Sequence, residues 1–555
     1  IPKFTNLVFY SNSFVGSIDN VSVKEYTSAD MDVTRATAAT RVDEDGLVNY
    51  AEVLGSELVT CGDFECAVPL NSWTISGGNA EITSGLLNFT NATSFGTSVL
   101  NSSTVLAGIS YEVRYTISNY ISGSTRIRLG SEFGANRNAN GDYVETVIAS
   151  NTSILFYSTG SNTTLSIDNV SVKEVTRDNV PRIDYTGGGC PHILAEPQRT
   201  NLFEYSESFN ESEWSRTSVT VVDNSSQSPD GTNNASLLYP SSSGDYRYMH
   251  NTTTASSSTY TISAFVKASG KNVVWFYINS ASNNGFIYYD LSDQTTQVVA
   301  GSVGTPTATI ISYGNDWYKI SLTTGTAVAL ASGSGIGVSD AKGDPAVTTN
   351  GTDGVLVWGL QLEAGSYATS YIPTSGSTVT RNQDIFTRDG IGSLINSTEG
   401  VLFVEMAKHN GNTVAPVISL NNGTSSQTVA LYYFSTDEIA FDVISSSPNV
   451  SGVSSSYNTD NFNKIALKYK SGDIALWVNG VEVLTKTNTI SLTGLNKISF
   501  DYGNGTYSFY GKVRQLQVYD TALTDEQLLQ LTGESGTDFY ESYAEMASAL
   551  TYTIQ

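Results

Sequence analysis

The feature that most constrains this chain is an internal repeat. Residues 6–25 read NLVFYSNSFVGSIDNVSVKE and residues 153–174 read SILFYSTGSNTTLSIDNVSVKE, so the phrase SIDNVSVKE occurs twice. Apolar and polar residues alternate in both copies, which is the period of a β-strand, and the Asp-Asn pair predicts a kink in that strand. The chain is therefore expected to contain more than one copy of a β-rich unit.

The two copies are not equally complete. The second copy closes a unit that spans residues 54–175, whereas residues 1–25 hold the closing strands alone. Two strands by themselves do not make a stable sheet. We therefore expect residues 1–25 to belong to a truncated β-sandwich that is completed by chain before Ile1 or by a neighbouring subunit.

Short alternating segments separated by Gly, Asn and Ser turns continue along the chain. They predict an all-β fold of tandem β-sandwich (jelly-roll) domains with a short C-terminal helical segment. The sandwiches are placed at residues 54–175, 201–377 and 378–533. Connectors at 26–53 and 176–200 separate them, and Pro and Gly in the second connector are expected to prevent regular structure.

The end of the chain carries local signals of its own. Residues 474–483 predict a hairpin around the Asn479-Gly480 turn. Thr524 and Gln527 predict a capping box at the start of a helix, with acids in its first turn. Residues 534–555 are expected to form a helical tail, with a last helix at about 538–550.

Charge excludes some classes of function. The chain has 28 Lys and Arg against 53 Asp and Glu, a net charge of −25. Phosphate contacts need clustered bases, so nucleic acid is not an expected partner. Membrane insertion is not expected either, because no run approaches the roughly 18 apolar residues of a span.

Two regions of the chain resemble known families. Residues 201–381, which include YTISAFVK, DWYKISLT and GVLVWGLQLEAG, resemble carbohydrate-binding-module-like sandwiches of phage tail and head fibres. The phrases NKIALKYKSGDIALWVNGVEV and GKVRQLQVYDTALTDEQLLQL resemble a concanavalin A-like, laminin-G-like domain. The resemblance implies binding modules in a viral context, but these folds host many functions.

Little in the sequence suggests catalysis. The three histidines, His192, His250 and His409, form no Ser/His/Asp order or HExxH motif, and we expect them to be surface or loop residues. A pair of carboxylates for glycosidic cleavage stays open. Cys190-Pro191-His192 offers too few ligands for zinc.

The remaining cysteines and the acidic turns leave alternatives. Cys61 and Cys66 could close a small disulfide or remain thiols, and thiols are favoured for a virion protein that folds in a reducing cytosol. The resemblance allows a structural calcium ion. Asp353-Gly354 and Asp501-Tyr502-Gly503 could supply ligands for it, although ordinary Asx turns explain the same residues.

Sugar binding needs exposed aromatic rings beside polar side chains, because the apolar face of a pyranose stacks on a ring. The candidate glycan-binding residues are Tyr246, Tyr248, Tyr288 and Tyr289, with packing inside the sandwich as the alternative. Trp317 and Trp358 lie in alternating strands and are expected in the core.

The sequence thus favours a non-enzymatic bacteriophage fibre protein, of head or tail, on the virion surface. The expected partners are a host-surface glycan, other virion proteins through the N-terminal segment, and two further copies in a homotrimer. A bacterial secreted or cell-surface adhesin is the first alternative, and a polysaccharide-degrading enzyme with binding modules is the second.

Overall fold

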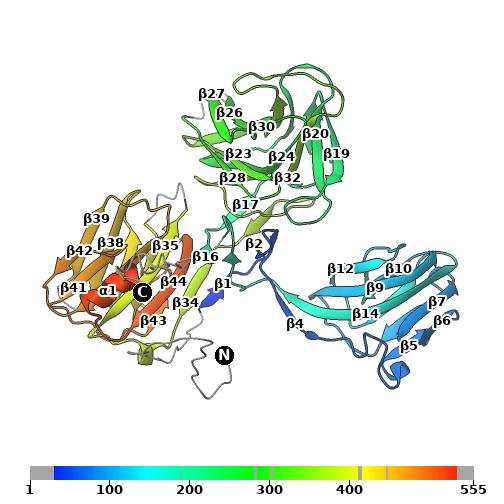
Figure 1. Ribbon diagram of the computed structural model, residues 1–555, viewed down its shortest axis with the longest axis horizontal. Coiled ribbons are helices and arrows are strands. Elements are labelled where there is room, and N and C mark those ends of the chain that lie inside the picture. The colour runs from blue at the N-terminus through cyan, green and yellow to red at the C-terminus, as the bar shows by residue number, and fades with distance from the viewer. Residues whose placement is uncertain are drawn as a thin grey trace, which may run out of the picture.

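Three β-sandwiches surround a small central hub (Figure 1). The structure, a computed structural model, describes residues 31–188, 190–280, 284–299, 304–409, 415–445 and 448–533. The all-β prediction of tandem sandwiches is confirmed, since each lobe is built from antiparallel sheets. The closing strands expected at 1–25 and the helix expected at 538–550 lie outside the described residues.

The first described lobe has one sheet in the order β11-β10-β13-β8-β5 and another in the order β12-β9-β14-β7-β6, with β4 beside β14. A 3-10 turn (Pro69–Asn71) precedes β5. The strands are β4 (Val53–Glu57), β5 (Trp73–Ser76), β6 (Ala80–Thr83), β7 (Leu86–Ala92), β8 (Ser98–Asn101), β9 (Ser110–Ser122), β10 (Thr125–Leu129), β11 (Glu132–Phe133), β12 (Gly141–Ile148), β13 (Ile154–Ser158) and β14 (Thr163–Thr176).

The described copy of the repeated phrase forms β14, and its predicted kink is present. Its pairing with β9 shifts register between Asp168 and Ser171. Asn169 there has a φ of 53°, in the left-handed region that Asn tolerates better than most residues. The last residues of β14, from Lys173 to Thr176, pair with β4.

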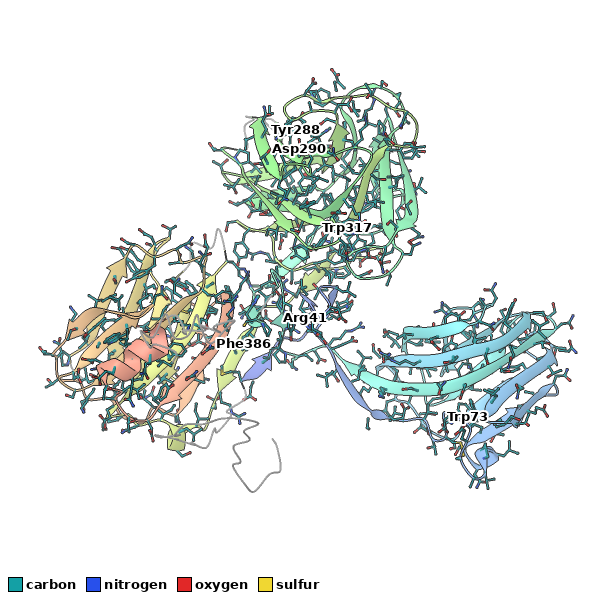
Figure 2. All side chains as sticks on the ribbon, viewed as in Figure 1. Arg41, Trp73, Tyr288, Asp290, Trp317 and Phe386 are labelled. Atoms are coloured by element: carbon teal, nitrogen blue, oxygen red, sulfur yellow. A yellow bond between two sulfur atoms is a disulfide. The ribbon has the colours of Figure 1, made fainter. Side chains whose placement is uncertain are left out.

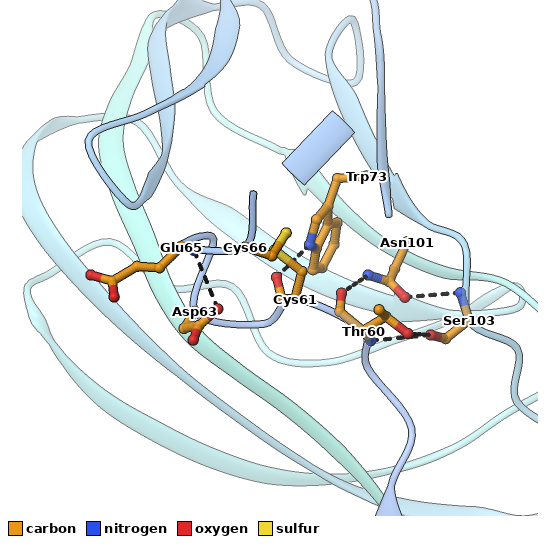
Figure 3. The surroundings of a disulfide bond; sticks show 8 residues. All are labelled: Thr60, Cys61, Asp63, Glu65, Cys66, Trp73, Asn101 and Ser103. Atoms are coloured by element: carbon orange, nitrogen blue, oxygen red, sulfur yellow. Dashed lines mark hydrogen bonds between the residues drawn. A yellow bond between two sulfur atoms is a disulfide. The ribbon is translucent and has the colours of Figure 1, made fainter. Parts of the chain in front are cut away.

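Cys61 and Cys66 are joined by a disulfide, so the preference for thiols was wrong. The loop between them folds tightly because Phe64, which is buried, packs on the Trp73 ring at a centroid distance of 5.1 Å. The Trp73 indole N–H also donates to the Cys61 carbonyl at 2.8 Å (Figure 3). The disulfide thus closes a loop over the core of this lobe.

Replacing both bonded cysteines by serine should lower the thermal stability of this lobe. Cross-linking so short a loop removes unfolded-chain entropy worth about 2 kcal/mol. Calorimetry of the Cys61→Ser/Cys66→Ser variant checks this, with Cys190→Ser as the control because Cys190 is exposed and unbonded. Equal melting of the double variant and the control would refute a stabilising role.

The second lobe has one sheet in the order β18-β22-β30-β25-β26-β27, with β23 beside β30, and another in the order β19-β20-β32-β24-β29-β28. The strands are β18 (Trp214–Thr217), β19 (Val219–Ser226), β20 (Ala235–Pro240), β22 (Arg247–Asn251), β23 (Ala255–Ser258), β24 (Tyr260–Ser269), β25 (Val273–Ser280), β26 (Asn284–Asp290), β27 (Thr295–Val299), β28 (Thr307–Ser312), β29 (Tyr318–Thr323), β30 (Val328–Ser339), β32 (Gly354–Ala364) and the short ribbon β21 (Gly244–Asp245) with β31 (Ala346–Val347).

The third lobe has sheets in the orders β1-β34-β43-β36-β37-β38-β39 and β15-β16-β44-β35-β40-β41-β42. The elements that follow the second lobe are β34 (Ile385–Arg388), a 3-10 turn (Gly392–Leu394), β35 (Glu399–Lys408), β36 (Val417–Asn421), β37 (Thr428–Tyr433), β38 (Glu438–Ile444), β39 (Val450–Ser455), β40 (Asn463–Lys470), β41 (Ile474–Val478), β42 (Val481–Lys486), β43 (Lys497–Ser499), β44 (Gly511–Tyr519) and α1 (Asp525–Thr532). The hairpin at β41 and β42 and the Thr524 capping box are both as predicted.

The connectors are not irregular, which corrects that expectation. Their strands are β1 (Asp32–Thr34), β2 (Thr40–Val42), β3 (Val48–Tyr50), β15 (Ile183–Asp184), β16 (His192–Ala195) and β17 (Arg199–Asn201), which pairs with β33 (Val379–Arg381). Pro191 and Pro197 stand just outside β16, where proline bounds a strand without breaking its ladder. β1 and β16 each extend one sheet of the third lobe.

The hub is formed by residues 31–52, 177–201 and 379–384, and a chain of buried charges holds it together. Asp384 accepts Arg35 Nη1 at 2.7 Å through one carboxylate oxygen and Arg182 Nη2 through the other. Glu196 accepts Arg182 Nη1 at 2.6 Å and lies 2.8 Å from Arg381 Nη1. All five side chains are at most 3% exposed.

Each charge in the hub is compensated. Burial alone would raise the pKa of Glu196, but the charges of Arg381 and Arg182 hold it well below its ordinary value. Backbone carbonyls accept further donors, with Arg35 Nη2 bonding Val180 O at 2.8 Å and Arg381 Nη2 bonding Pro197 O at 2.8 Å. Segments far apart in the sequence must therefore meet in one arrangement.

Arg182→Met should destabilise the hub by about 3–5 kcal/mol, because breaking a buried ion pair leaves carboxylates without compensation. Urea unfolding, together with protease cleavage in 176–200, checks this. The control is Arg388→Met, whose partner Asp32 is 65% exposed, so its cost should stay below about 1 kcal/mol. Similar small losses in both variants would contradict the role given to the cluster.

Two histidines lie where the hub meets the third lobe, which corrects their placement as surface or loop residues for His192 at least. His192 is 4% exposed, with Nε2 3.4 Å from Asp184 Oδ1. The half-buried His409 ring stacks on Tyr367 at 5.2 Å. Burial lowers the pKa of each to about 4.

Stability should therefore fall as the pH drops from about 6.5 toward 4. The unfolded chain takes up these protons near pH 6.5, before the folded protein does, so protonation favours unfolding. Each histidine contributes a slope approaching about 1.4 kcal/mol per pH unit. Comparing unfolding free energies of wild type and His192→Gln from pH 7 to 4.5 checks this. Identical slopes would contradict it.

Candidate functional site: an aromatic array on the second lobe

The strongest candidate site lies on the outer face of the sheet that contains β22, β25 and β26. Figure 2 shows Tyr288 and Asp290 at one end of the second lobe. That end points away from the hub, in which Arg41 is labelled. Side chains alternate between the two faces of these strands. Met249, Phe276 and Ile287 point into the sandwich core, so their neighbours in sequence line the outer face.

Strand register sorts the outer side chains into two rows. One row runs Tyr248, Gly337, Trp275 and Tyr288 across β22, β30, β25 and β26. The parallel row runs His250, Gly335, Tyr277 and Phe286. Each row therefore carries three rings and one glycine.

The two glycines let the rings converge. A Cβ placed on Gly337 would lie 2.2 Å from the Trp275 ring, and one on Gly335 would lie 2.0 Å from the Met249 carbonyl oxygen. Any larger residue at either position of β30 would displace its neighbours. The glycines thus create the space in which rings from β22 and β25 meet.

The rings form one continuous array. Centroid distances are 5.6 Å from Tyr248 to Trp275 and 5.2 Å from Tyr248 to Tyr277. Tyr277 and Phe286 are stacked at 5.9 Å. Tyr246 joins from the loop beside β21, 6.2 Å from Trp275 and 6.1 Å from Phe286.

The exposure of the rings to solvent differs across the array. Trp275, Tyr277 and Tyr288 are buried, whereas Tyr248 and Phe286 are half-buried. Tyr246 is 47% exposed and has a φ of 54°, an unusual conformation for a bulky residue. Tyr246 is therefore the ring most able to meet a ligand, over a floor of rigid rings.

The array is uncharged near neutral pH. Burial, with the nearby Tyr248, raises the pKa of Tyr277, and burial with the nearby Tyr246 and Asp344 raises the pKa of Tyr288 to about 12. Burial lowers the pKa of His250. Both phenols stay protonated and the imidazole stays neutral, so the rings can stack and donate without carrying charge.

Polar side chains edge the array. Gln297 pairs across strands with Tyr288, and the exposed Asp245 precedes Tyr246. Asp290 lies at the end of β26, 3.9 Å from Lys342 Nζ. Amide and carboxylate groups beside stacked rings are the combination that hydroxyl-rich ligands use.

The four predicted tyrosines fare differently. Tyr246, Tyr248 and Tyr288 share this face, although Tyr288 is only 3% exposed. Tyr289 is a wrong candidate, because the next residue in a strand points the other way. It is fully buried and donates its hydroxyl to Ser321 O at 2.6 Å inside the core.

Sequence reasoning missed Trp275, Tyr277, Phe286 and His250. A signal was present, since VVWFYI places Trp275 and Tyr277 two residues apart and GSGIGV places a glycine at every second position from 333 to 337. The expectation that Trp317 and Trp358 are core residues is confirmed, since they are 4% and 1% exposed.

A cavity of about 470 Å³ lies between β28, β29, the hub and the third lobe. Charged groups of both signs line it, including Lys319, Asp460 and Lys512. Lys319 Nζ already donates to Thr369 O at 2.7 Å. The cavity is a mixed-charge seam between domains and has none of the ring rows of the array.

The acidic turn at Asp501 is held by hydrogen bonds of its own. Asp501 Oδ1 accepts from Ser499 Oγ at 3.0 Å and from the Gly503 amide, as in an Asx turn. Within the described ranges, no cluster of three or more His, Cys, Asp or Glu is placed to hold a metal. No described helix is long and apolar enough to cross a membrane.

Comparison with known proteins identifies one domain. Residues 402–529 match the concanavalin A-like lectin/glucanases superfamily, so the third lobe is a concanavalin A-like domain. That part of the resemblance is confirmed. No curated protein matches the chain.

Solved structures with similar folds include carbohydrate-binding modules. The CBM40 of a Ruminococcus gnavus IT-sialidase, bound to α2,3 sialyllactose, is 19% identical over 26% of this chain and 86% of its own, with a TM-score of 0.23. A CBM22 tandem of Paenibacillus barcinonensis Xyn10C is 16% identical over 56% and 98%, with a TM-score of 0.20. Mouse laminin α1 domains LG4-5 are 11% identical over 60% and 94%, with a TM-score of 0.19.

Proposed function

We propose that this chain is a non-enzymatic adhesion protein that binds a surface glycan through the aromatic array of its second lobe. The observation that carries the proposal is the pair of ring rows that close over Gly335 and Gly337, with Tyr246 exposed above them. Burying so many rings on an outer face goes beyond what the sandwich core requires. It prepares a rigid stacking platform, which lowers the entropy cost of binding.

The array suits an uncharged sugar. The C–H face of a pyranose stacks on Tyr246, and its hydroxyls bond to the polar edge at Asp245 and Gln297. These contacts resemble those of small-molecule sites, with an apolar floor and few polar groups that fix orientation.

The finer assignment is a bacteriophage head or tail fibre on the virion surface. It is supported by the resemblance of residues 201–381 to the sandwiches of such fibres. A homotrimer, with other virion proteins attached through the N-terminal segment, would present several weak sites at once and raise the overall avidity. Capsid and tail genes beside this gene would support the virion assignment, whereas a secretion signal and sorting domain would favour a bacterial adhesin.

Tyr246→Ala should weaken binding of neutral glycans by about tenfold, or ~1.4 kcal/mol, because it removes the exposed stacking ring. The measurement is a glycan array with the intact protein, followed by titration of the best neutral ligand. Tyr507→Ala is a matched control, since Tyr507 is also exposed, at 59%, and also has a positive φ, of 56°.

The proposal fails if Tyr246→Ala binds as tightly as wild type, or if Tyr507→Ala loses as much affinity. It also fails if the wild-type protein, shown to be folded, binds no glycan and no susceptible cell. Release of sugar fragments from host polysaccharide would replace the adhesion role with an enzymatic one.

A further inference from the structure

A second, chemically different surface lies on the first lobe. The outer face of the sheet β11-β10-β13-β8-β5 carries Arg126 and Arg128 among three rings, Phe95, Phe133 and Tyr157. Phe95 is 58% exposed and Phe133 is 41% exposed. Large exposed rings grouped beside charged groups are typical of interaction sites.

Strand alternation explains why both arginines share this face. In β10, Ile127 and Leu129 are fully buried in the core, so Arg126 and Arg128 point outward between them. Register places Tyr157 opposite Arg126 and Phe133 opposite Arg128. The two guanidinium groups therefore start from backbone positions roughly 7 Å apart.

Both guanidinium groups stack on rings. Arg126 Cζ lies 3.5 Å from the centroid of Phe133 and 5.6 Å from that of Phe95. Arg128 Cζ lies 4.8 Å from the centroid of Tyr157. Stacking occupies the flat face of a guanidinium and leaves its N–H edge available for an acceptor.

These two arginines have no acceptor within the part of the chain that the structure describes. Neither forms an ion pair or hydrogen bond there, and the Nε of each is enclosed without a partner. The other arginines of this lobe are paired, with Arg114 2.6 Å from Glu112 and Arg137 3.7 Å from Glu145. In a chain of net charge −25, two arginines with neither a partner acid nor another acceptor are unexpected.

We propose that this face binds a carboxylate-bearing glycan. The guanidinium edges of Arg126 and Arg128 donate charge-assisted hydrogen bonds to sugar carboxylates, and the exposed faces of Phe95 and Phe133 receive pyranose rings. Repulsion by the rest of the acidic chain is screened beyond about 10 Å at 0.1 M salt. The local pair of positive charges therefore decides the preference.

An acidic peptide is the other chemistry that arginines accept. Peptides that bind sheets commonly add a strand to a free edge and use backbone hydrogen bonds. The groups here project from the face of the sheet, with Ser98 outward beside Tyr157 as a further hydroxyl. Rings, guanidinium edges and hydroxyls on a face match a sugar better than an extended peptide.

The test is calorimetric titration of the intact protein with oligogalacturonate and with its fully methyl-esterified form, which has no charge. Wild type should bind the acid form and not the ester. Arg126→Gln and Arg128→Gln should each weaken binding by about tenfold or more. Arg128→Lys should give an intermediate loss, because it keeps the charge but loses the planar fork.

Arg114→Gln is the matched control, since it removes the same charge from the same lobe but away from this face, and should bind like wild type. Tyr246→Ala should also bind like wild type, which separates this site from the aromatic array. Thermal melting identifies a variant that does not fold, and Arg126→Lys then serves in its place.

Four results would overturn the proposal, and three of them concern the sugars and the variants. They are equal binding of acid and ester, equal loss in Arg114→Gln and Arg126→Gln, and no binding of either oligogalacturonate or hyaluronan oligosaccharides by folded wild type. A polyglutamate peptide that binds as tightly as the acidic sugar would also overturn it, in favour of a general peptide surface.

Discussion

The buried ion cluster of the hub is the constraint on which the arrangement of this molecule depends. Asp384 compensates Arg35 and Arg182, and Glu196 compensates Arg182 and Arg381. A buried charge without a partner costs several kcal/mol, so each segment is stable in the hub only when the others are present. Replacing the cluster by apolar residues would save desolvation energy, but the ion pairs specify geometry. Arg182 bonds Glu196 through one terminal nitrogen and Asp384 through the other, so the planar guanidinium fixes the direction of both partners.

That geometry determines which surfaces the molecule presents. β1 and β16 extend the two sheets of the concanavalin A-like lobe, while β17 pairs with β33 beside the second lobe. Tyr288 of the aromatic array then lies at the end of the second lobe away from the hub (Figure 2). The proposed arginine face lies on a different lobe, which β4 and β14 join to the hub. One uncharged and one positive surface in a single chain would let the protein recognise two kinds of sugar, with avidity when both engage.

The sequence predicted the sandwiches because alternation, turns and caps are local signals. It did not predict the hub, because Pro191 and Pro197 suggest that the connector between them is irregular. Only the pairing of β16 with β44, which is distant in the sequence, shows that this connector forms a strand. The sequence does contain one shared pattern in the hub, since Arg35, Arg182 and Arg381 each stand two residues after a Val. Tyr289 was a wrong candidate because the presence of tyrosine does not tell which face of the sheet its ring occupies. The state of Cys61 and Cys66 was predicted from the expected cellular compartment, whereas the packing of their loop on Trp73 decides it. Tertiary pairing decided each of these cases.

The most direct test of this account is the distance between the second and third lobes. Spin labels on Asn233 and Glu482, which are exposed positions on those two lobes, can be measured by double electron–electron resonance in a Cys190→Ser background. A hub fixed by buried ion pairs predicts one narrow distance distribution for the intact protein in solution. A broad distribution, as from two sandwiches on a flexible connector, would contradict the claim that the ion cluster sets their arrangement.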